Sequence, residues 1–296
     1  MTAATTTSRR KRAAVPRLTE PAAHTAIEAC CRTLGLPTIR DEHDRIAEAA
    51  ARERLTHNGF LAALLTAECD ERQARRRMRL VNEAKFPRIK RLEDFDLTAL
   101  PTLPAATLAN LAAGGWIDAG EPVVLLGDSG TGKTHLLIGL GLAAAEAGRH
   151  VRYVTTAALV NELAEAADTK MLSRVVARYG RLDLLCLDEL GYVHLDPHGA
   201  ELLFQIITER EEKASIACAS NAPFSEWGRT FTDPRLAAAV VDRLTFNAHI
   251  IDTGSNSYRL RTTRAARTTT PARSTQPDHV KKGGANSSHH GGAKSS

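Results

Sequence analysis

The chain has 296 residues, a length that suits one large domain or two modest ones. Hydrophobic residues make up 43% of it and aromatic residues only 4%, so its core must be built from Ala, Leu, Val and Ile. No apolar run approaches the roughly 20 residues that span a bilayer, which argues against a membrane protein. The net charge of +5 comes from the two ends, because residues 1–17 and 262–296 each carry +5 and residues 18–261 carry −5. The overall basic charge is therefore no argument that the folded part binds nucleic acid.

The two ends of the chain are predicted to be disordered. Residues 1–17 are rich in Thr, Ala and Arg, and residues 262–296 are rich in Thr, Ser, Gly, Pro and His with almost no large apolar side chain. The cysteines show neither a CxxC pair nor a Cys/His ligand spacing, so we interpret them as reduced thiols of a cytoplasmic protein. They are Cys30, Cys31, Cys69, Cys186 and Cys218.

Residues 18–90 are predicted to form a small all-α N-terminal domain that binds DNA or a partner, since they show helical periodicity and no strand pattern. Apolar side chains recur on one helical face at Phe60, Leu64, Ala67, Ala74, Met78 and Val81. An arginine stripe follows the same period on an adjoining face and consists of Arg72, Arg75, Arg76 and Arg79. Such a stripe is either a surface that contacts phosphates or an ordinary solvated helix face.

From about residue 121, short apolar runs alternate with helical segments. The runs are Val123–Leu126, Val151–Val154, Leu182–Leu187, Ser215–Ser220 and His249–Asp252. Runs that are apolar throughout suit strands buried on both faces. Their alternation with helices predicts an α/β fold with a parallel sheet flanked by helices.

The first of these runs leads directly into the phosphate-binding pattern GxxxxGK[ST], and an apolar helix is predicted to follow. The pattern consists of Gly127, Asp128, Ser129, Gly130, Thr131, Gly132, Lys133 and Thr134. Its glycines let backbone N–H groups face phosphate oxygens at a helix N-terminus. Lys133 is expected to reach the β- and γ-phosphates of ATP, and Thr134 to give its hydroxyl to Mg²⁺. We therefore predict a P-loop NTPase.

Two carboxylates end the apolar run that begins at Leu182. Asp188 is expected to hold Mg²⁺, and Glu189 to orient and polarise the attacking water. A strand that leads into an acidic turn is common, so this interpretation depends on the phosphate-binding pattern about 55 residues earlier.

Two further residues are candidates for catalysis. Asn221 follows another predicted strand and could hold water near the γ-phosphate beside Asp188, although Asn after a strand is also an ordinary turn residue. Arg243 could stabilise charge on the transferring phosphoryl group of a neighbouring subunit. The alternative for Arg243 is a surface salt bridge.

Four segments in this order resemble the IstB-like transposition helper ATPases, an AAA+ family related to the DnaA initiators and DnaC helicase loaders. They are residues 127–136, 187–192, 220–227 and 242–244, and His135 joins the nucleotide-binding set. Weaker likenesses lie at residues 58–68, at the domain junction 92–96 and at the C-terminal end 257–260. The resemblance covers roughly residues 25–261, and residues 262–296 depart from the family pattern. The apolar pattern ends near Leu260, which leaves little room for the helical lid found in many AAA+ proteins.

The resemblance implies an AAA+ ATPase domain at residues 91–261 that oligomerises with ATP, binds duplex DNA and works with a cognate transposase. An extra helical insertion precedes the acidic strand in this group, and residues 157–167 and 171–179 occupy that place. Lys170, Arg174 and Arg178 are therefore candidate DNA contacts.

Three functions remain open at this stage. The leading one is an ATP-hydrolysing helper of a transposase, and the alternative is a DnaC-like loader that requires a replicative helicase. A third is a scaffold in which ATP is only a structural switch. The pair Asp188–Glu189 argues against the scaffold, because a switch has no need of a carboxylate that polarises water.

Overall fold

The computed structural model describes residues 18–192, 194–255 and 257–258. The ends predicted to be disordered, residues 1–17 and 262–296, lie outside the described residues, as do Arg259 and Leu260 of the family-like C-terminal segment. No helix of the described part is both long and apolar enough to cross a membrane.

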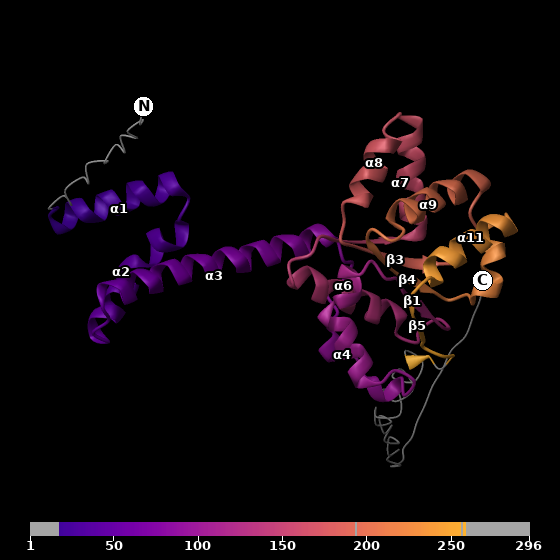
Figure 1. The fold of residues 1–296 in the computed structure, drawn as a ribbon, viewed down its shortest axis with the longest axis horizontal. Helices are drawn as coiled ribbons and strands as arrows, with labels where there is room; N and C mark the ends of the chain where they lie inside the picture. The colour runs from indigo at the N-terminus through magenta and orange to yellow at the C-terminus, as the bar shows by residue number, and fades with distance from the viewer. Residues whose placement is uncertain (1–17, 193, 256, 259–296) are drawn as a thin grey trace, which may run out of the picture.

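Three helices make up the N-terminal part: α1 (Glu20–Leu34), α2 (Pro37–Arg52) and α3 (His57–Ala84). Figure 1 shows α1 and α2 gathered around the beginning of α3, which then runs as one long rod to the sheet. The last turns of α3 bury Leu80 and Ala84, and Ala84 packs into the same core as the sheet. The end of α3 thus packs with the part that we predicted to begin at residue 91, and that boundary stays a prediction.

Four short elements connect α3 to the sheet: η1 (Leu92–Asp94), η2 (Leu97–Ala99), α4 (Ala105–Ala113) and α5 (Gly115–Asp118). The buried side chains of α4 and α5 include Leu108, Leu111 and Trp116. They pack against the same face of the sheet as the end of α3.

The sheet has five strands: β1 (Val123–Leu126), β2 (Val151–Thr155), β3 (Leu184–Leu190), β4 (Ser215–Ser220) and β5 (His249–Asp252). Their order is β2-β3-β4-β1-β5, and every neighbouring pair is parallel. The inner strands are buried on both faces, which explains their continuous apolar sequences. This confirms the predicted α/β fold class: a parallel sheet flanked by helices, with a small all-α segment before it.

Alternate strand residues face two separate cores, because side chains along a strand point to opposite faces. On one face, Val123 and Leu125 pack with α6 (Lys133–Glu146), α4 and the end of α3. On the other face, Val124 packs with a second set of helices (Figure 1). That set comprises α7 (Thr156–Asp168), α8 (Leu172–Gly180), α9 (Pro197–Arg210), α10 (Trp227–Phe231) and α11 (Pro234–Thr245).

Candidate functional site

The phosphate-binding pattern forms the loop between β1 and α6, as its sequence predicts. Gly127 has φ +138°, and a Cβ there would lie 2.4 Å from the Thr253 hydroxyl. Gly132 has φ +106°, and a Cβ there would lie 2.8 Å from the Phe95 ring. Only glycine fits these two positions, because the backbone conformation and the close neighbours both exclude a side chain.

Lys133 is the first residue of α6, and its side chain folds back over the loop. Its Nζ donates hydrogen bonds to the carbonyl oxygens of Gly127 at 2.6 Å and of Asp128 at 2.7 Å. The residue is only 9% exposed, so its charge is largely shielded from solvent. An ammonium group held in this way lies where a phosphate would take it as a strong charge-assisted donor.

A pocket of about 430 Å³ opens over the loop and the ends of β3 and β4. Its lining includes most of the predicted site: Ser129, Gly130, Thr131, Gly132, Lys133, Thr134, His135, Asp188, Glu189 and Asn221. Gly127 and Asp128 are not lining residues; they contribute the carbonyl groups that hold Lys133. Segments of sequence up to 92 residues apart therefore meet at one pocket, at the carboxyl edge of the sheet where α/β proteins bind ligands.

Asp188 lies in β3 with its carboxylate buried, and the residue is 4% exposed. Its Oδ2 accepts a hydrogen bond from the Tyr153 hydroxyl at 2.7 Å, and its Oδ1 accepts one from the Glu189 N–H at 2.9 Å. These two donors fix the carboxylate, which shares the pocket with Thr134. Carboxylate and hydroxyl oxygens are ligands that Mg²⁺ prefers, so Asp188 and Thr134 fit the donor set of a magnesium ion.

Glu189 is exposed and has φ +59°, an unusual backbone conformation for a residue other than glycine. The register between β3 and β4 shifts here: Leu187 pairs with Cys218 but Leu190 pairs with Ser220, which leaves one extra residue on β3. Such bulges often turn a side chain next to an active site. We predicted that the strand ends at Leu187, whereas β3 continues through this bulge to Leu190.

Asn221 follows β4 and reaches the same pocket, as predicted. The turn that carries it is fixed by Ser220, whose Oγ accepts hydrogen bonds from the Ala222 N–H at 3.1 Å and the Trp227 Nε1–H at 3.2 Å. Trp227 is fully buried and packs edge-on against Phe224. These two aromatic residues are thus packing groups that support the turn.

Sequence reasoning missed a strap of residues that ties the loop to the end of β5. The hydroxyls of Thr131 and Thr253 lie 2.6 Å apart, and the Asp128 N–H donates to the Gly254 carbonyl at 2.9 Å. Tyr258 extends the strap, because its N–H donates to the Gly130 carbonyl at 3.0 Å. A signal was present: Thr253 directly follows a strand parallel to β1, so both must end at the same edge of the sheet.

A second group was also missed, on the connecting segment before the sheet. Phe95 lines the pocket and packs edge-on against His135, with ring centroids 5.3 Å apart. His135 Nε2 lies 2.8 Å from the carbonyl oxygen of Arg91. The predicted nucleotide-binding His135 therefore joins the loop to this segment, and Phe95 supplies an apolar wall that suits a flat ring.

Arg243 does not line this pocket. It lies inside α11, which runs to Thr245, and its Nε is 2.9 Å from Glu211 Oε2, although without the geometry of a hydrogen bond. Its guanidinium lies 4.7 Å over the Phe204 ring. Within its own subunit, Arg243 therefore forms a salt bridge with Glu211, which is the alternative role that we predicted for this residue from the sequence.

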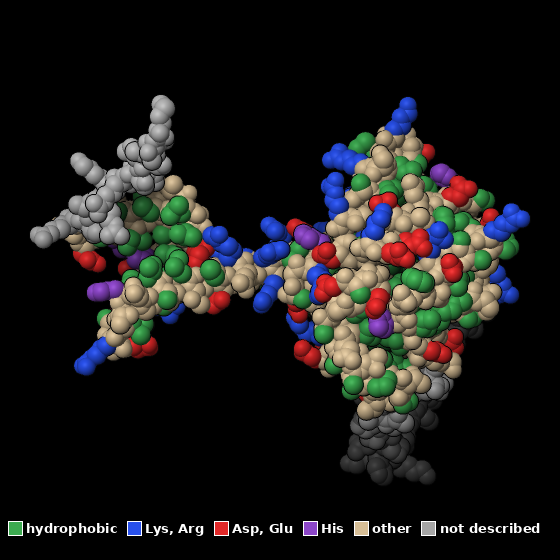
Figure 2. Space-filling view, in the orientation of Figure 1, with side chains coloured by type: hydrophobic (Ala, Val, Ile, Leu, Met, Phe, Trp, Pro, Cys, Tyr) green, Lys and Arg blue, Asp and Glu red, His purple; other side chains and the backbone are tan. Residues whose placement is uncertain are grey.

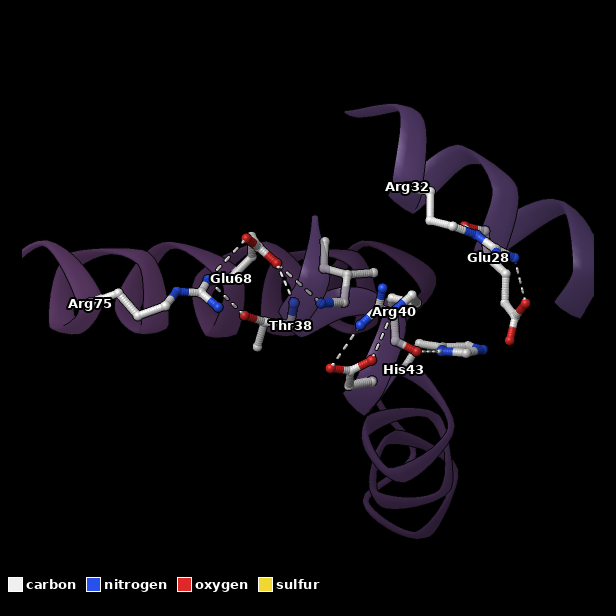
Figure 3. Close-up of polar contacts among 9 residues, drawn as sticks. Glu28, Arg32, Thr38, Arg40, His43, Glu68 and Arg75 are labelled. Atoms are coloured by element: carbon white, nitrogen blue, oxygen red, sulfur yellow. Dashed lines mark hydrogen bonds and ion pairs between the residues drawn. The ribbon is translucent and has the colours of Figure 1, made fainter. Parts of the chain in front are cut away.

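The arginine stripe is partly engaged inside the N-terminal part. Glu68 is 3% exposed and accepts hydrogen bonds from the N–H groups of Thr38 at 2.8 Å and Ile39 at 3.1 Å, so it caps the beginning of α2 (Figure 3). Burial raises the pKa of Glu68, but these N–H groups and Arg72 outweigh it and lower the pKa overall. Arg72 and Arg75 lie 3.2 and 3.6 Å from its carboxylate. Two of the four arginines thus neutralise a buried acid.

The remaining candidate DNA contacts differ in how they are held. Arg79 pairs with Glu83 at 3.6 Å, and Arg178 is bonded to Glu162. Arg76, Lys170 and Arg174 are exposed, and the described residues offer them no hydrogen-bond or ion-pair partner. Figure 2 shows Lys and Arg side chains along the α7–α8 end and where α3 meets the sheet-bearing part.

Known proteins are similar to this chain in sequence and in structure. Residues 29–266 match the family described as IstB-like ATP binding protein. One relative is the ATP-binding protein of insertion sequence IS5376 from Geobacillus stearothermophilus, as its name describes it. It is 37% identical over 235 residues, which cover 79% of this chain and 94% of that protein. Its counterpart named for IS21, from Pseudomonas aeruginosa, is 34% identical over 78% of this chain and 89% of its own length. Among solved structures, AMPPCP-bound DnaA from Aquifex aeolicus is similar with a TM-score of 0.49 and 20% identity, over 64% of this chain and 58% of that one.

Proposed function

The chain belongs to the family of IstB-like ATP binding proteins, and we propose that it is an ATP-hydrolysing helper of an insertion-sequence transposase that assembles on duplex DNA during target selection. The observation that carries the proposal is the single pocket that joins the phosphate-binding loop to Asp188, Glu189 and Asn221. The relatives' names, which link ATP binding to insertion sequences, support transposition over replicative helicase loading.

ATP binding is assigned to the loop and to Lys133. Backbone N–H groups at the beginning of α6 hold the phosphates, and Lys133 exchanges its two carbonyl partners for phosphate oxygens. Thr134 and Asp188 would hold Mg²⁺, which would neutralise phosphate charge. Phe95 provides the apolar surface for the adenine ring.

Hydrolysis is assigned to Glu189 and Asn221. The attacking water loses its proton to the Glu189 carboxylate as its oxygen bonds to the γ-phosphorus, and ADP departs as the leaving group. Asn221 orients that water from the neighbouring strand end. The exposed position of Glu189 on the bulge lets its side chain turn toward the nucleotide.

Oligomerisation is assigned to contacts that bring Arg243 of one subunit to the nucleotide of the next. Arg243 is distant from its own pocket, so it can act on a phosphate only across an interface. Its partner Glu211 is one-third exposed, which makes the ion pair exchangeable. Coupling of assembly to ATP binding follows, because the nucleotide supplies a better partner for the guanidinium.

DNA binding is assigned to the exposed cations outside these ion pairs. Arg76, Lys170 and Arg174 are suited to phosphate contacts because no carboxylate of the described residues neutralises them. Alanine at these positions is expected to weaken binding about equally for all duplex sequences and to reduce its salt dependence.

The decisive test is Glu189→Gln in the full chain, with Glu212→Gln as a matched control. Glu212 is also exposed and also has a positive φ, +56°, but it does not line the pocket. We expect Glu189→Gln to bind ATP as the wild type does, to hydrolyse it at least about a hundredfold more slowly, and to stay assembled on duplex DNA. Nucleotide binding, phosphate release and electron microscopy with DNA measure the three outcomes.

Two results would contradict the proposal. If Glu189→Gln hydrolysed ATP at the wild-type rate, the assignment of Glu189 to hydrolysis would be wrong. If the wild type bound no adenine nucleotide with magnesium present, the proposed ATPase function would be wrong. Purification from native cells separates the alternative, since a DnaC-like loader would bring down a hexameric helicase rather than a transposase.

A further inference from the structure

Three side chains with metal-binding atoms converge in the N-terminal part, far from the nucleotide pocket. They are His24 on α1 and His43 and Asp44 on α2, and one ligand atom from each lies within 4.8 Å of the others. His24 Nε2 is 3.2 Å from Asp44 Oδ2, and His43 Nε2 is 3.3 Å from Asp44 Oδ1. In a tetrahedral site with bonds of about 2.0–2.1 Å, neighbouring ligand atoms lie about 3.3 Å apart, so both distances suit a shared ion.

The environment of His43 points to a cation. Its ring is buried, with the residue 8% exposed, and its Nδ1 lies 3.0 Å from the carbonyl oxygen of Arg40 (Figure 3). A carbonyl oxygen can only accept, so Nδ1 carries a hydrogen, and Nε2 is the nitrogen left to bind a cation. Among the described residues, that buried Nε2 has no hydrogen-bond partner. A histidine held by a backbone carbonyl, with its other nitrogen free, is the usual arrangement of a metal ligand.

The position of Asp44 makes the case stronger. A lone pair on His43 Nε2 and a carboxylate oxygen 3.3 Å away are two acceptors, which repel each other unless a proton or a cation lies between them. A metal ion between them would satisfy both groups and His24 together. The Asp44 side chain is 72% exposed, so an ion has a path from solvent.

The N-terminal part also has little core to hold α1 in place. Among described residues 18–70, Cys31, Ala50 and Leu64 are the only buried apolar side chains, and Leu34 is 69% exposed. Small units with so thin a core commonly depend on a disulfide or a metal for stability. A ligand from α1 and two from α2 would link these helices directly.

We propose that His24, His43 and Asp44 bind one divalent transition-metal ion, of which Zn²⁺ fits the donors best, and that this ion staples α1 to α2. Two imidazoles and one carboxylate suit zinc, cobalt or nickel rather than the all-oxygen sites of magnesium and calcium. Three protein ligands leave a fourth position for water.

The test uses the full chain, freed of metal by a chelator and kept reduced, and titrated with Co²⁺ and then Zn²⁺. The variants are His24→Ala and Asp44→Asn, both at exposed side chains, and the control is His57→Ala, an exposed histidine at the beginning of α3. We expect wild type and control to bind one more equivalent of metal ion per chain than either variant does. If the variants still bind that ion, we expect wild type and control to bind it at least tenfold more tightly. Bound Co²⁺ should show tetrahedral d–d absorption that Zn²⁺ removes, without thiolate charge transfer.

The melting temperature provides a second readout. We expect Zn²⁺ to raise the melting temperature of the N-terminal part in wild type and control but not in the two variants, because an ion that binds only the folded state stabilises it. Equal binding by His24→Ala and wild type, or a thiolate spectrum, would overturn the proposal. A melting temperature of the wild type that Zn²⁺ did not change would also overturn it, and His24, His43 and Asp44 would then be an ion-paired cluster only.

Discussion

Replacing Tyr153 with Phe removes the hydroxyl on β2 that donates to the Asp188 carboxylate. That hydroxyl donates to Asp188 Oδ2 at 2.7 Å, while the ring packs near Phe86 with centroids 6.2 Å apart. Burial, followed by the hydrogen bond to Asp188, raises the pKa of Tyr153, so the group remains a protonated donor at every working pH. Phe keeps the ring contacts and loses only the donor.

The expected magnitude follows from what Asp188 retains. A hydrogen bond to a charged group contributes about 1.5–3 kcal/mol. Asp188 keeps its second donor, the Glu189 N–H at 2.9 Å, so we expect the free energy of unfolding to fall by the lower figure, about 1.5 kcal/mol. Losing a group that orients a metal-binding side chain weakens metal affinity by roughly 10–100-fold. With one donor left, we expect the Mg²⁺ concentration for half-maximal hydrolysis to rise about tenfold.

A second tyrosine provides the control. The Tyr179 hydroxyl donates to Glu162 Oε2 at 2.6 Å, and Tyr179 is buried but does not line the nucleotide pocket. Tyr179→Phe should therefore destabilise the fold by a similar amount and leave the Mg²⁺ dependence unchanged. Denaturant unfolding measures the first effect, and hydrolysis over a magnesium titration measures the second.

One result would refute this reasoning. If Tyr153→Phe lowered stability as Tyr179→Phe does, yet kept its Mg²⁺ dependence within twofold of wild type, the hydroxyl would support the fold alone. Tyr153 would then not be a positioning residue for Asp188.

Three further tests concern other parts of the structure. Gly127→Ala should abolish ATP binding, because its Cβ would lie 2.4 Å from a threonine hydroxyl. The control is Gly148→Ala, since Gly148 has φ +98° but open space around it. This control should lose about 1–2 kcal/mol of stability and bind ATP normally in a fluorescence titration. Glu68→Gln should destabilise the chain by roughly 1–3 kcal/mol at pH 7. The pKa of this carboxyl is lowered in the folded state, so the difference in unfolding free energy between wild type and variant should shrink as the pH falls below 4.5, the ordinary pKa of the group. Denaturant unfolding at several pH values measures this difference. A difference that stayed constant with pH would refute the charge of Glu68 as its cause. Arg243→Ala and Lys133→Ala should each be inactive alone and regain phosphate release when mixed, whereas an inactive mixture would argue against Arg243 acting across subunits.

The sheet could be predicted from sequence almost residue by residue. The bounds of β1, β4 and β5 are those of the runs at residues 123–126, 215–220 and 249–252. Strands β1 and β4 lie inside the sheet and are buried on both faces, which favours continuous apolar sequences, whereas β5 is an edge strand. The pattern also predicted the pocket, because strands and the phosphate-binding loop bring their carboxyl ends to one edge. The bulge at Glu189 could not be predicted, as carboxylates at a strand end look like a turn.

What the sequence hides is long-range pairing. Tyr153 and Asp188 are 35 positions apart, and Thr131 and Thr253 are 122 apart, so no local pattern joins them. The arginine stripe shows the opposite limit, since its spacing was visible but the burial of Glu68 was not. Helical periodicity gives the face on which a charge lies, and only packing decides whether that face meets solvent or a buried acid.

Helix α3 has a mechanical consequence. Its residues 60–84 contain neither Gly nor Pro, and its last turns pack on α6, the helix that begins at Lys133. Twenty-eight residues at 1.5 Å each make a strut about 42 Å long. A tilt of about 10° at its base would move the opposite end by roughly 7 Å, so a small shift where α3 meets α6 would displace α1 and α2 much further.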